Sequence, residues 1–249
     1  MCLLAFHWQP QSDLPLQVWA NRDEFMARPA QATHLWPESQ TVLAGRDLQG
    51  GGTWMGVTLH GRFAALTNVR DPNMPSAERS RGELAAAYLR SEMSAAAFSQ
   101  QIQSERERYG GFNLLLADAD ALWCVGSHQP EPIEIAAGWH GLSNATLDAP
   151  WPKLTRLLNG AQALTEQQVH VPQAHLALLS DTTPAPDTEL PNTGVGLAME
   201  RVLSPICIRT PAYGTRNSTW LRIARDGVYW HEQDYNEGVQ REFELARLS

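Results

Sequence analysis

The feature that most constrains this chain is the cysteine that follows its initiator methionine. The side chain of Cys2 is small enough for removal of Met1, which would leave one residue carrying both a thiol and a free α-amine. The thiolate can attack a carbonyl, and the amine, with an ordinary pKa near ~8, can accept and return the proton. Residues of this kind are a known variant of the catalytic triad. The sequence therefore predicts a catalytic site built around the chain's beginning.

The segment 16–24 is expected to fold back beside Cys2 at the start of the chain. After a polar turn, the apolar run 16–20 leads into the charged stretch Asn21-Arg22-Asp23-Glu24. Two paired strands would place Asp23 where it could hold the α-ammonium of Cys2, and a nearby cation would lower the pKa of the thiol. The alternative stays open at this point, because Cys2 could be a small apolar residue in a first strand and 21–24 a solvated strand end.

Composition narrows the classes of partner. The chain has 249 residues, a net charge of −8 and no run of lysines or arginines, so nucleic acid and anionic membrane surfaces are poor candidates as principal partners. Lys153 is the single lysine among 19 basic residues. Nothing in the sequence indicates an oligomeric state.

Targeting and metal-binding signals are missing from the sequence. There is no signal peptide, and no apolar run approaches the 18 residues of a transmembrane segment. Three cysteines are too few for a disulfide framework, so a cytoplasmic protein is expected. The histidines lack metal-ligand spacing, and Pro172 lies between His170 and His175. We therefore expect no metal and no cofactor.

Hydrophobic periodicity predicts strands at both ends of the chain and helices in two central blocks. Loops are expected at 28–39 and 182–193, and the glycines at 50–52 are interpreted as a tight turn. The expected strands are 1–8, 16–20, 41–47, 53–57, 62–68, 112–117, 122–126, 133–135, 138–143, 213–223, 227–232 and 239–245. The expected helices are 81–90, 94–109, 152–164 and 173–179. This segregated order indicates a single α+β domain over 1–249 with mostly antiparallel sheets.

Several short motifs together resemble one known family. They are Met1-Cys2-Leu3-Leu4, Asn21-Arg22-Asp23-Glu24, Gly51-Gly52-Thr53-Trp54, Leu66-Thr67-Asn68, Gly141-Leu142-Ser143-Asn144 and Tyr213-Gly214-Thr215-Arg216. Each is weak alone, but together they resemble, over essentially the full length, the NRDE family, whose eukaryotic members are called transport-and-Golgi-organisation proteins. That family is similar to N-terminal-nucleophile hydrolases of the penicillin V acylase, bile-salt hydrolase and acyl-coenzyme A acyltransferase type. The resemblance implies a four-layer αββα sandwich.

The resemblance also implies roles for five residues. Cys2 would be the nucleophile and Asp23 would hold its α-amine, while Asn68 and Asn144 would surround the oxyanion and Arg216 would lie close to the thiolate. One departure concerns the acylase pattern Arg-Asn-x-Asp-Trp. This chain has Ala20 in the place of that arginine, with Arg22 two positions further along the strand.

Two functions from different classes remain. The first is an amide or thioester acyl hydrolase, or an acyltransferase, that works through an acyl-Cys2 intermediate on a small-molecule substrate. Its pocket would be lined by Arg22 and by the tryptophans Trp54, Trp139 and Trp151. The second is a non-catalytic carrier that binds a hydrophobic ligand, such as a lipid, acyl-coenzyme A or haem, in the same pocket, since a fold can be reused without its chemistry.

Overall fold

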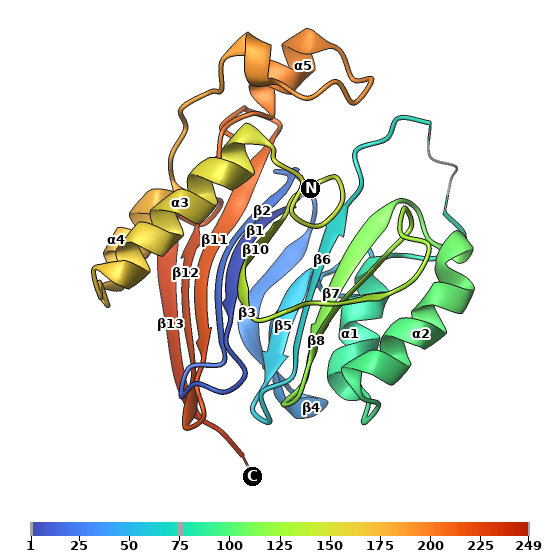
Figure 1. The fold of residues 1–249 in the computed structure, drawn as a ribbon, viewed down its shortest axis with the longest axis vertical. Coiled ribbons are helices and arrows are strands. Elements are labelled where there is room, and N and C mark those ends of the chain that lie inside the picture. Colours follow the sequence, from blue (N-terminus) through green and yellow to red (C-terminus); the bar gives the residue numbers. More distant parts are fainter. Residues whose placement is uncertain (1, 74–76, 249) are drawn as a thin grey trace.

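The computed structural model of the protein describes residues 2–73 and 77–248. Within them, two antiparallel sheets stack face to face (Figure 1). The six-stranded sheet has the order β10-β1-β2-β11-β12-β13 and the seven-stranded sheet the order β3-β4-β5-β6-β7-β8-β9. The first contains β1 (Cys2–Trp8), β2 (Leu16–Phe25), β10 (Gly138–Leu142), β11 (Tyr213–Ile223), β12 (Gly227–Asp234) and β13 (Val239–Ala246). The second contains β3 (Ala30–Trp36), β4 (Ser39–Asp47), β5 (Met55–Thr58), β6 (Phe63–Asn68), β7 (Phe112–Ala117), β8 (Leu122–Gly126) and β9 (Ile133–Glu134).

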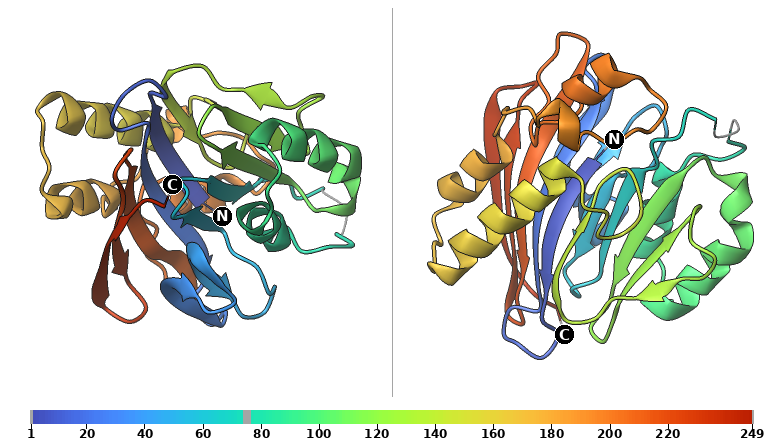
Figure 2. Two further views of the ribbon diagram at one scale, coloured as in Figure 1. Left: turned by 90° about the horizontal axis from the view of Figure 1, so that it is seen from below. Right: turned by 45° about the horizontal axis from the view of Figure 1, so that its top comes forward.

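Helices cover the two outer faces of this sandwich (Figures 1 and 2). The seven-stranded sheet is covered by α1 (Gly82–Arg90) and α2 (Ala95–Glu105), and the six-stranded sheet by α3 (Pro152–Glu166) and α4 (Pro172–Leu179). The short helix α5 (Leu197–Val202) lies above one end of the sandwich, and the 3-10 helices are Arg106–Arg108 and Asp187–Glu189. The predicted four-layer αββα arrangement is confirmed. Each helix of the described residues is too short or too polar to cross a membrane.

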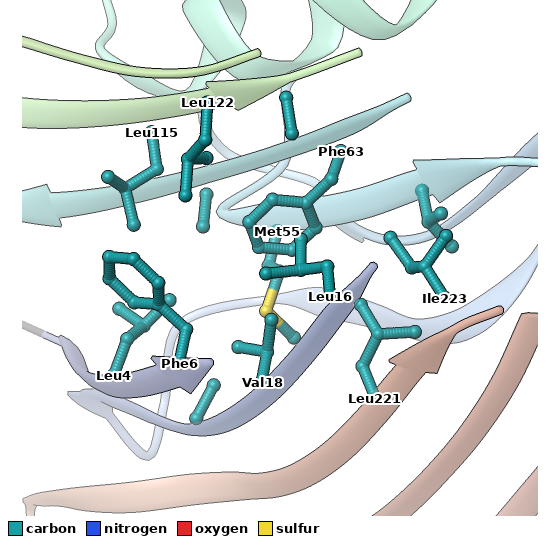
Figure 3. Packing of buried hydrophobic residues seen from close by; sticks show 14 of the residues in the cluster. Leu4, Phe6, Leu16, Val18, Met55, Phe63, Leu115, Leu122, Leu221 and Ile223 are labelled. Atoms are coloured by element: carbon teal, nitrogen blue, oxygen red, sulfur yellow. The ribbon is translucent and has the colours of Figure 1, made fainter. Parts of the chain in front are cut away.

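The strand period of two divides the side chains of β1 between two cores. Cys2, Leu4 and Phe6 point into the core between the sheets, where they meet residues of the seven-stranded sheet such as Leu115 (Figure 3). Leu3 and Ala5 belong instead to the cluster beneath α3 and α4. Burial of each large apolar side chain contributes about 1.5–3 kcal/mol, so both faces of β1 hold it in place. The first catalytic candidate therefore begins a rigid strand.

Two predicted helix starts are confirmed by their local geometry. The side chain of Ser94 accepts a hydrogen bond from the backbone N–H of Ala97 at 3.2 Å and caps α2. Pro152 begins α3, where its missing N–H costs nothing. Helix α2 ends at Glu105, earlier than expected, because a 3-10 turn follows it.

Three segments differ from the prediction. The expected loop 28–39 contains β3, an edge strand whose two buried residues, Thr33 and Trp36, lie three positions apart because the register shifts between them. Its alternating apolar pattern is therefore weak. Strand β2 continues through the charged stretch to Phe25, because those polar groups are paired within the protein. The six residues of α5 are too few for a helical period to show in the sequence.

Strand register brings the predicted site residues together. Cys2 lies opposite Arg22 on the neighbouring strand β2. Strand β2 also pairs with β11, where Thr215 lies opposite Asp23 and Asn217 opposite Arg22. The register shifts between these two pairs, so Arg216 is the extra residue of a β-bulge. The candidate site therefore lies where β1 begins and β2 and β11 are distorted.

Candidate active site at the start of the first strand

A cavity of about 400 Å³ opens beside the start of β1. Its lining includes five residues predicted for the site, namely Cys2, Arg22, Asp23, Trp54 and Asn68. They come from both sheets and from the turn that precedes β5. Five of the nine predicted site residues thus share one cavity, and most of its other walls were not predicted.

The thiol of Cys2 is nearly closed off, since the residue is only 6% exposed. Burial raises the pKa of this thiol to about 11, while the guanidinium of Arg22 acts in the opposite direction. A thiol with such a pKa is protonated at neutral pH, so nucleophilic attack needs an adjacent base. Met1 and its removal, which would create that base, lie outside the described residues.

Asp23 lies on the face of β2 opposite to that of Arg22 and is buried. Its Oδ1 accepts a hydrogen bond from the hydroxyl of Thr215 at 2.7 Å. The hydroxyl oxygen of Thr215 in turn accepts from the backbone N–H of Ile208 at 2.9 Å, which fixes its orientation. Burial raises the pKa of the Asp23 carboxyl, and the strongest opposing influence is the charge of Lys153. Asp23 is therefore a rigidly held carboxyl beside the start of β1.

Asn68 and Asn144 are joined to each other. The side-chain amide of Asn144 donates to the carbonyl of Asn68 at 2.9 Å, and the N–H of Arg70 donates to the carbonyl of Asn144 at 2.8 Å. These bonds connect the end of β6 to the turn that follows β10. Asn68 lines the cavity, whereas Asn144 is buried behind it and fixes the backbone of Asn68.

Arg216 lies in a second, smaller cavity of about 40 Å³. Its guanidinium donates to the backbone carbonyls of Phe25, at 3.4 Å, and Arg28. Arg22 and Trp54 line both cavities and separate Arg216 from the lining of the larger one. The bulge in β11 accounts for this placement, because it changes the direction of the Arg216 side chain.

Trp139 and Trp151 do not belong to the described lining of either cavity. Trp139 lies opposite His7 on β1, and the two rings stack at 4.3 Å on the face of the sheet that α3 covers. The ring of Trp151 lies under the guanidinium of Arg70 at 4.7 Å. Both tryptophans thus pack in the outer layer of the molecule.

Charged side chains dominate the larger cavity, and the sequence predicted only two of them, Arg22 and Asp23, for the site. The arginines are Arg22, Arg28, Arg79 and Arg81, and the carboxylates are Asp23, Glu24, Asp47 and Asp71. Arg28 pairs with Asp47 at 2.7 Å. The guanidinium of Arg81 donates to the carbonyl of Gly111 at 2.8 Å, and none of its ion pairs with a carboxylate appears among the described residues. Among the described residues, a substrate in this cavity would meet the ion pair of Arg28 with Asp47 and the guanidinium of Arg81, which donates to a backbone carbonyl.

Arg70, Glu200 and Lys153 form a buried ionic cluster, and the charges of Lys153 and Arg70 act on Asp23. Arg70 and Glu200 form an ion pair at 2.6 Å, and both side chains are almost fully buried. Lys153 is buried beside them in α3. The only sequence signal that could have identified this residue is that it is the chain's single lysine.

Comparisons with known proteins agree with this fold. The chain matches the family model described as Transport and Golgi organisation 2 over residues 1–237. It is 34% identical to a cattle protein named Transport and Golgi organization protein 2 homolog, with 91% of this chain and 90% of that one covered. The human homolog is 32% identical over the same shares.

A solved structure extends the comparison to the fold. The C2A mutant of the conjugated bile acid hydrolase from Clostridium perfringens superposes with a TM-score of 0.52 at 8% identity, covering 98% of this chain and 92% of that one. At such low identity the likeness shows the fold alone, which is that of the N-terminal-nucleophile hydrolases. From the match over most of its length, the chain belongs to the Transport and Golgi organisation 2 family.

Proposed function

We propose that this protein is an acyl hydrolase or acyltransferase that cleaves amide or thioester bonds through an acyl-Cys2 intermediate. The observation that carries the proposal is the position of Cys2 at the start of a rigid strand, in the wall of a 400 Å³ cavity that Asp23 and Asn68 also line. A thiol whose pKa is raised by burial needs a base before it can attack a carbonyl. The chain that begins at Cys2 would provide one in its own α-amine.

The chemical steps follow from that arrangement. The α-amine takes the proton of the Cys2 thiol, and the sulfur attacks the carbonyl carbon of the substrate. The developing oxyanion is stabilised by Asn68, a contribution that is typically about 3–4 kcal/mol for one preorganised donor. As the tetrahedral intermediate collapses, the bond to the leaving nitrogen or sulfur breaks and the amine returns the proton to that group. Water or an acceptor then attacks the acyl-Cys2 thioester and regenerates the thiol.

The cavity lining favours a substrate that carries polar or charged groups near the bond to be cleaved. Four arginines and four carboxylates line it, together with a smaller apolar part that includes Trp54, Leu66 and Val69. A purely apolar ligand would remove these charges from water without giving them new partners, which is costly even for charges that are paired with each other. The fold relative is named a conjugated bile acid hydrolase, and hydrolysis of a conjugated acyl compound agrees with the proposed chemistry.

The carrier function differs from the enzyme in one measurable respect, since it needs no covalent step. We infer a cytosolic site of action for either function, because all three cysteines are free thiols. A cytosolic carrier of lipid, acyl-coenzyme A or haem would bind its ligand in the same cavity and release it unchanged.

Mass spectrometry of the intact protein separates the two functions. The chain beginning at Cys2 is incubated with a set of acyl-coenzyme A thioesters and N-acyl amino acids, and Cys2→Ala is the matched control. We expect an increase in mass equal to one acyl group in the native protein and none in the variant. A folded chain that begins at Cys2 and is never acylated across the set, while it retains bound ligand, would support the carrier.

A further inference from the structure

The single lysine of the chain occupies a buried position in this protein. Lys153 is the second residue of α3 and is only 2% exposed. Its Nζ has no hydrogen-bond partner among the residues that the structure describes. Removal of an ammonium group from water costs several kcal/mol, so a lysine of this kind is uncommon unless it has a role.

The position of Lys153 is fixed by the packing of the helix that carries it. Pro152 sets the first turn of α3, and the next residue, Leu154, packs so closely on Gly141 of β10 that no side chain fits at that glycine. The start of α3 lies near the start of β1 in Figure 1 and in the right-hand view of Figure 2. Lys153 is therefore held near the beginning of the first strand.

Four ionisable groups from different elements act on Lys153. They are Cys2 on β1, Asp23 on β2, Arg70 after β6 and Glu200 on α5. Tyr213 on β11 acts in turn on Arg70. Arg70 and Glu200 neutralise each other as a pair at 2.6 Å. Asp23 is the charged group that acts most strongly on Lys153, and Lys153 is the one that acts most strongly on Asp23.

We propose that Lys153 is a positioning residue of the site. Its ammonium keeps the Asp23 carboxyl ionised, and Asp23 in turn controls how readily the amine and the thiol of Cys2 gain and lose protons. The catalytic meaning of this role rests on the proposed function. The electrostatic coupling between the two side chains does not depend on it, because it is a property of the folded protein.

The expected ionisation of both groups agrees with this role. Burial lowers the pKa of Lys153 to about 8, with Asp23 acting in the opposite direction. Below that pH the ammonium is charged and opposes the effect of burial on Asp23, whose pKa burial raises. Loss of the positive charge would make Asp23 easier to protonate. A neutral Asp23 could no longer attract an α-ammonium on Cys2.

The first test observes the lysine directly. Protein labelled with ¹³C at the lysine ε-carbon gives one side-chain signal, because Lys153 is the only lysine. We expect its titration midpoint to lie near 8, and Asp23→Asn to move the midpoint down by about one pH unit or more, since the variant removes a neighbouring negative charge. Glu24→Gln is the matched control, because Glu24 is the next residue of the same strand and should not move the midpoint. An unchanged midpoint in Asp23→Asn would overturn the proposal.

The second test uses the chain that begins at Cys2 and needs no substrate. The rate of Cys2 alkylation by iodoacetamide is measured against pH for the native protein, Lys153→Met and Lys153→Arg. We expect Lys153→Met to shift the profile to higher pH and to slow alkylation at pH 7 by about threefold or more, because it removes a cation near the thiol. Lys153→Arg, which keeps the charge, should restore much of the rate. Equal profiles in all three proteins would contradict the proposal.

The two proposals can fail separately. If Asp23→Asn shifts the lysine signal and no substrate acylates Cys2, the proposed function fails and the coupling of Lys153 to Asp23 stands. If Cys2 is acylated normally in Lys153→Met with an unchanged pH profile, the enzyme stands and the role of Lys153 is wrong.

Discussion

Cys2 and Cys124 belong to the same core, but their thiols lie in different environments. Both belong to the cluster between the sheets, and burial raises the pKa of their thiols to about 11 and about 12. Cys124 lies within β8, where its sulfur accepts a hydrogen bond from the side-chain amide of Gln129 at 3.6 Å. Cys2 lies at the start of β1, in the wall of a cavity lined by charges. Burial alone thus makes both thiols inert.

What separates them is the chemistry that surrounds each sulfur. Asp23 raises the pKa of the Cys2 thiol and the guanidinium of Arg22 lowers it, and the electrostatic influence of Cys2 reaches Arg81 in the lining of the same cavity. Cys124 is acted on by the carboxylate of Asp148, which raises its pKa further. Only Cys2 can gain an amine within its own residue. The comparison indicates that the position in the chain, more than burial, selects the nucleophile.

The largest effect should come from exchanging sulfur for oxygen at each position. Cys2→Ser should lower the rate of acyl transfer by at least about 10³-fold, because a hydroxyl is a much weaker nucleophile beside the same base. Cys124→Ser should leave that rate unchanged and lower the free energy of unfolding by about 1–3 kcal/mol, since it buries a hydroxyl in an apolar environment. Acylation kinetics and urea unfolding measure the two outcomes. Similar losses of activity in both variants would remove the distinction.

The next largest effect should come from removal of Met1, which changes the reactivity of Cys2. Two preparations are compared, one beginning at Met1 and one at Cys2. In the longer chain a thiol pKa of about 11 leaves only about one thiolate in 10⁴ at pH 7. We expect alkylation of Cys2 to be at least about a hundredfold faster in the shorter chain, with Cys124 as the internal reference. Equal rates would mean that the α-amine does not activate the thiol.

Much of this arrangement could be predicted from the sequence, for physical reasons. Strand alternation and the order of strands and helices indicated an α+β domain with mostly antiparallel sheets, and the resemblance to the NRDE family implied the four layers. The segment ending in Asp23 was correctly expected to return to Cys2, because a short polar turn permits little except a hairpin. Trp139 was placed in the pocket by its residue type, whereas its register opposite His7 directs it to the outer face. The register between strands that are distant in sequence depends on tertiary packing, so it cannot be predicted from a local sequence pattern.

The remaining differences have similar causes. The bulge that moves Arg216 into the second cavity depends on how β11 meets β2, across nearly 200 positions of sequence. Lys153 lies near the start of β1 only because α3 packs over β1 and β10. Arg22, Asp23 and Glu24 of the charged lining belong to a recognised motif. Arg79 and Arg81, in the segment before α1, and Asp47 of β4 carry no motif of their own.

A smaller effect, on the pH dependence of stability, is expected from the buried carboxyl of Glu232. Glu232 is buried like Asp23, and burial raises its pKa to about 7. Because the folded protein then binds a proton more tightly than the unfolded chain, stability should fall as pH rises from about 4.5 to 7. Glu232→Gln should lack this decline, a difference of about 2–3 kcal/mol across the window. Thermal unfolding against pH measures it, with the exposed Glu131→Gln as control. Parallel pH profiles in the native protein and Glu232→Gln would show that this carboxyl titrates normally.

The most direct measurement is the pH dependence of alkylation at Cys2 and Cys124 in one sample of the chain that begins at Cys2. Iodoacetamide labelling, followed by peptide mass spectrometry, reports both rates at each pH. The account predicts that Cys2 reacts with a midpoint below the ordinary thiol value of ~8.5, while Cys124 stays almost unlabelled up to pH 10. If the two cysteines react equally slowly over that range in folded protein, Cys2 is a core residue and the catalytic account is wrong.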